Sequence, residues 1–127
     1  MASITIKGLD ELLKKVGNAD KNLNNILRDT TKESAEVILP KLKANTPKDS
    51  GNLQDSEEIV YANGGLRAEI GPNPTKAPYA PFVELGHHTR SGSFVPGQRY
   101  VERTLLENKR DVKEKFIKAV RLLLKTN

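Results

Sequence analysis

The residues best suited to chemistry in this sequence are two adjacent histidines, His87 and His88, with Glu84 three positions before them. Imidazole and carboxylate groups are zinc ligands, so the trio points to a small metal-dependent hydrolase. Adjacent side chains usually point in different directions, however, and the chain has no cysteine and no third histidine to complete a set of three or four protein ligands. Surface histidines in a loop are therefore the simpler interpretation, and we expect no metal and no cofactor.

Other forms of catalysis have still less support. Ser91 and Ser93 flank Gly92 without the Gly-x-Ser-x-Gly arrangement that exposes a nucleophilic serine. Glu57 and Glu58 could meet another acid in space, but as solvated charges on a hairpin they need no catalytic role. The sequence therefore predicts a protein that is not an enzyme.

Length and composition predict one small domain, residues 1–127. Of the 127 residues 36% are hydrophobic, and only three tyrosines and three phenylalanines are available for the core, which we expect to be mainly aliphatic. No apolar run approaches the roughly 20 residues that cross a bilayer, and the N-terminus lacks the pattern of a secretion signal. We expect a protein without membrane contact, made and used in a cytosol or in something assembled there.

The net charge of +5 permits contact with nucleic acid. Nine Lys or Arg residues and four Asp or Glu residues lie between Arg99 and Lys125, so this segment can account for the whole surplus. A basic, nucleic-acid-binding accessory protein is therefore an alternative. The acids interspersed among the bases favour a solvated surface over a dedicated nucleic-acid face.

A short strand and a long helical stripe are predicted in the N-terminal third. Ile4 and Ile6 alternate with polar residues, as in a half-buried strand. Apolar residues then recur with helical spacing from Leu9 to Leu42, and a proline ends the helix near residue 45. One rod of about 50 Å fits this pattern. Two helices broken at Gly17-Asn18 fit it equally well, whereas a continuous rod would need a neighbouring chain to cover its far end.

The middle of the chain is predicted to hold a β-hairpin followed by a loop. Two alternating runs span about residues 57–71 around Asn63-Gly64, the strongest short signal for a hairpin. Four prolines follow, and we expect them to exclude regular helix and strand from about the next dozen residues. Residues 86–97 are polar, contain glycine and show no periodicity, so residues 72–99 are expected to form a loop. A short apolar island at Tyr79 to Leu85 interrupts this region, and the long loop proper is expected at about residues 86–99.

The last segment is predicted to form a helix with apolar surface on two sides. One stripe consists of Val101, Leu105, Val112, Phe116, Ala119 and Leu123, and a second, roughly 100° away, consists of Leu106, Ile117, Val120 and Leu124. One stripe suffices for packing inside a domain, so the second is a candidate subunit contact. The expected fold class is α+β, with a long N-terminal and a C-terminal helix packed on a small, mainly antiparallel sheet.

Two motifs carry a resemblance to a known family. The first runs from Thr46 through Pro47 to Gly51-Asn52-Leu53 with Ser56 beyond it, and the second is Tyr79-Ala80-Pro81-Phe82-Val83-Glu84-Leu85-Gly86. With a long helix before them and a closing helix after them, they resemble the tail-completion or head-tail joining (neck) proteins of long-tailed bacteriophages over essentially the whole chain. The chain departs from the family pattern after Pro96, where Tyr100 takes the aromatic place before the last helix.

The resemblance implies a structural virion component, a ring-forming α+β subunit that joins the head connector to the tail and leaves a channel for DNA. The implied partners are further copies of the chain, in a closed ring of roughly six or twelve, a head-side connector or stopper protein, and a tail terminator or tail tube protein. DNA would pass through the lumen without sequence-specific binding. The implied location is the neck of a virion assembled in the bacterial cytoplasm.

On this interpretation the second motif is an assembly and docking element. We expect Tyr79, Phe82, Val83 and Leu85 to anchor the following loop on the core, Glu84 to accept hydrogen bonds from backbone or arginine donors, and Gly86 to release the chain into the loop. The loop would become ordered only on docking. The linker motif consists of Thr46, Pro47, Gly51, Asn52, Leu53 and Ser56.

Overall fold

The computed structural model of the chain describes residues 21–48 and 51–126. Its elements in chain order are α2 (Lys21–Asn45), α3 (Asn52–Ser56), β1 (Glu57–Ala62), the short 3-10 turn η1 (Asn63–Gly65), β2 (Arg67–Pro72), α4 (Ala80–Leu85), β3 (Gly86–His88), β4 (Phe94–Pro96) and α5 (Tyr100–Thr126). Long helices combined with small antiparallel sheets confirm the α+β class. The predicted strand at Ile4 and Ile6, and the question of a break at Gly17-Asn18, lie outside the described residues.

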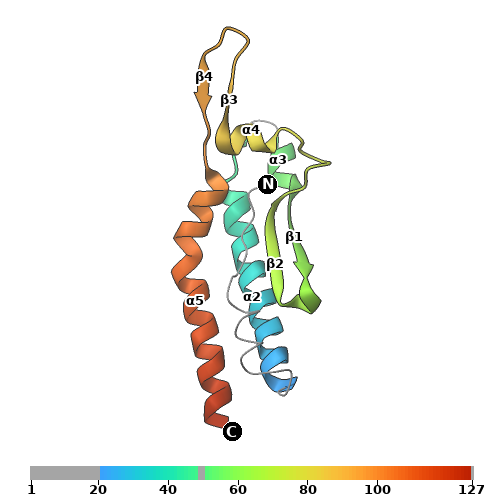
Figure 1. Ribbon diagram of the computed structural model, residues 1–127, viewed down its shortest axis with the longest axis vertical. Coiled ribbons are helices and arrows are strands. Elements are labelled where there is room, and N and C mark those ends of the chain that lie inside the picture. The colour runs from blue at the N-terminus through green and yellow to red at the C-terminus, as the bar shows by residue number, and fades with distance from the viewer. Residues whose placement is uncertain (1–20, 49–50, 127) are drawn as a thin grey trace.

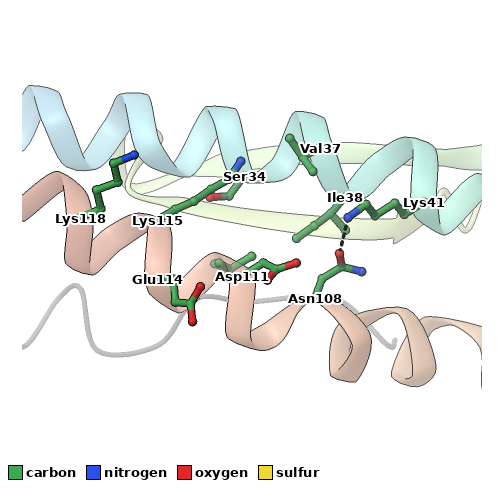
Figure 2. Close-up of a pocket in the computed structure, with 10 residues that line it drawn as sticks. Ser34, Val37, Ile38, Lys41, Asn108, Asp111, Glu114, Lys115 and Lys118 are labelled. Atoms are coloured by element: carbon green, nitrogen blue, oxygen red, sulfur yellow. Dashed lines mark hydrogen bonds between the residues drawn. The ribbon is translucent and has the colours of Figure 1, made fainter.

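The two long helices lie side by side and run in opposite directions (Figure 1). Asn45 at the end of α2 donates a hydrogen bond to Thr104 Oγ1 near the start of α5 at 2.9 Å. One turn further along, Lys41 Nζ donates to Asn108 Oδ1 at 3.0 Å (Figure 2). These contacts fix the register of the two helices. A residue of α5 lies level with a residue of α2 when their two residue numbers add up to about 149.

The core has two parts, one near each end of the helix pair. The larger part combines buried residues of α2, the β1–β2 hairpin and the start of α5, including Leu42, Ile70 and Tyr100. The smaller part lies toward the other end and is built on Leu23, Leu27 and Leu123. The helix pair is therefore held together by apolar contacts at both ends, which keep α5 beside α2 along its length.

Strands β1 and β2 form the predicted hairpin, and their pairing from Glu57 opposite Pro72 to Ala62 opposite Arg67 confirms it. The turn contains Gly64 at a positive φ of 65°, which glycine adopts without a steric penalty. Ala68 and Ile70 face α2 and are buried, in keeping with the period of two along a strand. The predicted end of α2 near residue 45 is also confirmed.

The prediction that residues 72–99 form a loop without regular structure is wrong. Helix α4 occupies residues 80–85, and β3 and β4 form a second antiparallel hairpin within the expected loop. Pro81 is compatible with α4 because it stands in the first helical turn, where a backbone N–H has no partner within the helix. The β3–β4 hairpin projects beyond the end of the helix pair (Figure 1). Among the described helices none is long and apolar enough to cross a bilayer.

Candidate docking site at the β3–β4 hairpin

The two sequence motifs meet at one apolar pocket beside the projecting hairpin. Its volume is about 310 Å³, and its lining residues are Pro47, Leu53, Tyr79, Phe82, Val83, His87, Val95, Pro96 and Gln98. The linker motif supplies the first two and the docking motif supplies the next three. None of the described side chains that line the pocket is a lysine, arginine, aspartate or glutamate. A mainly apolar concave surface of this kind suits apolar side chains of another protein better than a charged metabolite.

Large apolar side chains are exposed on α4 and on both faces of the hairpin, and of these Phe82 and Val95 line the pocket. Phe82 is 59% exposed and Leu85 56% exposed on α4, and Phe94 and Val95 on β4 are 55% and 42% exposed. The expectation that Phe82 and Leu85 anchor the loop on the core is therefore wrong. The sequence analysis identified an apolar island at Tyr79 to Leu85, but in the tertiary structure Phe82 and Leu85 face solvent.

Smaller residues do the anchoring instead. Ala77 and Ala80 are buried in the larger part of the core, and Val83 packs against it as expected. Tyr79 is exposed (36%) and lines the pocket, so the expectation that it anchors the loop on the core is also wrong. The alanines were not singled out from the sequence because a single buried alanine has no distinctive pattern.

Glu84 fixes the start of α5. Its carboxylate oxygens accept hydrogen bonds from the backbone N–H groups of Val101 and Glu102, both at 3.1 Å. The expectation of backbone donors to Glu84 is confirmed. A carboxylate at this end of a helix satisfies unpaired N–H groups and interacts favourably with the helix dipole. Because both oxygens are used in this way, Glu84 does not face the histidines as a metal ligand would.

Two close backbone contacts hold the base of the hairpin against α4. The N–H of Gln98 donates to the carbonyl of Val83 at 2.8 Å, and the N–H of Arg99 donates to the carbonyl of Glu84 at 3.1 Å. A Cβ atom on Gly97 would overlap the carbonyl oxygen of Glu84, and one on Gly86 would overlap backbone atoms of β4. The hairpin is thus tied to both α4 and α5. Gly97 was missed from the sequence because a glycine after a proline is typical of any loop.

The histidines lie on opposite faces of the hairpin. His87 lies opposite Val95 in the strand pairing, and its ring packs edge-on to Phe82 with ring centres 6.2 Å apart. His88 lies opposite Phe94, and the centres of their two rings are 5.2 Å apart. Within the described residues no group of three or more acidic residues or histidines is placed to hold a metal ion. The imidazole rings extend the apolar surfaces of the hairpin, one on each side.

A buried acid lies beneath this site, where the sequence suggested a solvated one. Glu57 is only 3% exposed, and its Oε1 accepts a hydrogen bond from the Tyr100 hydroxyl at 2.8 Å. Burial raises the pKa of Glu57 from its ordinary 4.5 to about 7, an effect that the hydrogen bond from Tyr100 reduces. Burial also raises the pKa of Tyr100, which therefore remains a donor at neutral pH. The pair ties the beginning of β1 to the beginning of α5.

The linker motif supports the same junction. Thr46 Oγ1 donates to the Leu42 carbonyl at 2.6 Å and lies 3.4 Å from Glu57 Oε1. Leu53 and Ser56 are buried, and Gly51 has a positive φ of 74° before α3. The linker residues thus brace the wall of the pocket, and Asn52 begins α3 at the surface.

The second apolar stripe of α5 divides into exposed and packed residues. Leu106 is 64% exposed and Ile117 41% exposed, whereas Val120 packs against the smaller part of the core. The side chain of Leu124 lies outside the described residues. Half of the predicted contact stripe is therefore open to solvent.

One comparison with known proteins gave a match. A family model described as "Bacteriophage HK97-gp10, putative tail-component" matches residues 10–86, more than half of the chain, and the match includes α2, the linker, β1–β2 and α4. Comparison with curated proteins and with solved structures gave no match. The chain therefore belongs to the HK97-gp10-like family and is a tail-related structural component of a bacteriophage.

Proposed function

We propose that this chain is a neck, or tail-completion, subunit that forms a ring between the head connector and the tail of a long-tailed phage. The ring encloses the channel through which DNA passes, and contacts DNA without reading its sequence. Its neighbours are other copies of the chain, a connector or stopper protein on the head side, and a tail terminator or tail tube protein on the other side. The protein resides in the virion neck.

The single observation that carries this proposal is the mainly apolar pocket at the base of a projecting hairpin. Phe82 and Val95 are exposed at the pocket, and Leu85 and Phe94 are exposed nearby on α4 and on the other face of the hairpin. Exposed apolar side chains of this size are costly in water and favour burial against a partner. The support is rigid, because Glu84 and the glycines at the hairpin base fix its direction relative to α5. A preformed apolar projection loses little conformational freedom when it docks, as suits a joint between two finished assemblies.

Complementation of a phage that lacks this chain tests the proposal. Val95→Asp places a charge beside the pocket without touching the core, and we expect full heads and complete tails that remain separate in electron micrographs. Ser91→Asp at the hairpin tip adds the same charge away from the pocket and is the matched control. If the Val95 variant gives joined particles, a neck function is contradicted. The same holds if it gives tails of abnormal length in place of complete tails that are not joined to heads.

A further inference from the structure

The outer surfaces of α2 and α5 carry stripes with matching spacing. On α5 the exposed residues Leu106, Arg110, Lys113, Ile117 and Arg121 recur every three or four positions, on the side turned away from α2. On α2 the exposed residues Asp29, Glu33, Glu36, Pro40 and Ala44 recur in the same way, on the side turned away from the core. One stripe has three basic residues and the other has three acidic residues.

The register of the helix pair places these stripes level with each other. Within the chain, Asn45 lies opposite Thr104 and Lys41 opposite Asn108. By the same rule Lys113 is level with Glu36, and Arg121 is level with Asp29. At no point along the two helices does a charged residue of one stripe lie level with a residue of the same charge in the other stripe.

These surfaces do not meet inside one subunit. Each stripe faces solvent on a different side of the helix pair, and only Glu33 reaches the chain's own α5, where Lys115 Nζ lies 3.7 Å away. Arg110 pairs within α5 with Glu114 at 3.2 Å. Lys113, Arg121, Glu36 and Asp29 form no ion pair with any described residue. Within residues 21–48 and 51–126 these four charges are thus available to a neighbouring molecule.

We propose that α5 of one copy of this chain packs along α2 of the next copy through these two stripes. The inference rests on the proposed ring. Rotation about an axis parallel to the helices keeps every residue at its own height, so residues that are level within a subunit are also level between neighbours. Lys113 then meets Glu36, Arg121 meets Asp29, and Leu106 covers Ala44. Because the two stripes are different surfaces, the contact repeats head to tail, and a pure rotation that divides the full circle evenly closes it into a ring.

Disulfide trapping tests the register directly, because the chain contains no cysteine. Glu36→Cys combined with Lys113→Cys should give, on mild oxidation of the full chain, a ladder of covalent species that ends at the ring. Each single variant should give no ladder. Glu36→Cys with Lys118→Cys is the matched control, since Lys118 reaches toward α2 across the groove between the two helices and is not part of the outer stripe (Figure 2).

Charge reversal provides a second, independent measurement. Lys113→Glu with Arg121→Glu should raise the concentration needed for half-maximal assembly by about tenfold or more. Adding Asp29→Lys and Glu36→Lys to the same chain should restore assembly. Lys109→Glu with Lys118→Glu changes the net charge equally outside the stripe and should leave assembly unchanged.

The outcomes separate the two proposals. Rings of wild-type mass with no ladder at residues 36 and 113, and with no effect of charge reversal, would overturn this interface and leave the ring intact. Wild-type protein that forms no ring, either alone or in virions, would overturn the proposed function and this inference together. Native mass spectrometry gives the mass, and circular dichroism shows that each variant is folded.

Discussion

Replacement of the buried acid Glu57 by glutamine should stabilise the protein at alkaline pH and have little effect in acid. Thr46 has one hydroxyl proton and donates it to the Leu42 carbonyl, so its 3.4 Å contact with Glu57 Oε1 suits a proton carried by the carboxyl group. Glu57 Oε2 is buried and has no hydrogen-bond partner among the described residues. The site is therefore built for a neutral side chain, which Glu57→Gln supplies at every pH.

The magnitude follows from the pKa. Burial raises the pKa of Glu57 from 4.5 to about 7, so the folded state holds its proton more tightly than the unfolded state. The protonated form of Glu57 therefore stabilises the folded protein fully below about pH 4.5, and this contribution is lost as the pH rises through 7. At about 1.4 kcal/mol for each pH unit, ionised Glu57 costs roughly 3 kcal/mol above pH 8. Glu57→Gln should recover most of this, while near pH 4.5 the two proteins should have similar stability.

Urea unfolding followed by circular dichroism from pH 5 to pH 9, at one protein concentration, measures the difference. Glu58→Gln is the matched control, because this neighbour is half-buried, accepts a hydrogen bond from Asn73 at 3.1 Å and changes the charge equally. Its effect should vary little across this range. We expect the free energy of unfolding of the wild type to fall relative to that of Glu57→Gln between pH 5 and pH 8. A constant or rising difference over this range would refute the reasoning.

Three further predictions concern the hairpin and its base. Glu84→Ala removes two hydrogen bonds to the first turn of α5 and should lower the free energy of unfolding by about 1–3 kcal/mol, and an unchanged urea midpoint would show that the cap is dispensable. Gly97→Ala should lower the melting temperature more than Gly92→Ala, whose added Cβ meets no atom but adopts an unfavourable positive φ, and the reverse order would contradict the close contact at the hairpin base. Phe82→Ser should change stability by less than about 1 kcal/mol whereas Leu53→Ala should cost about 2–5 kcal/mol, and equal losses in denaturation experiments would mean that Phe82 belongs to the core.

Local patterns predicted several parts of the structure correctly. The Asn-Gly pair fixed the β1–β2 hairpin, since few other dipeptides adopt the backbone angles of that turn. The proline at position 47 set the end of α2. The resemblance carried by the two motifs identified the family, because their order and spacing are more specific than either motif alone. These features depend on neighbours in the chain and need no long-range contact.

Local rules misjudged the region from residue 72 to residue 99. Prolines usually exclude regular structure, yet Pro81 stands in the first turn of α4, where it costs no hydrogen bond. The β3–β4 hairpin lacks a strong turn signal and is fixed at its base by α4 and α5, through contacts such as that between Gln98 and Val83. Contacts of this kind join segments that the sequence alone does not place together.

The sequence by itself determined the fold class, the family and the surplus of positive charge on the last helix, because composition, periodicity and short motifs carry that information. Only the tertiary structure decided which apolar and charged residues are buried. It turned Phe82 outward and Glu57 inward, contrary to their ordinary preferences, and it brought Pro47 and Leu53 against the hairpin to form a pocket. The physical reason is that burial depends on packing between distant segments, and residue type sets only its cost.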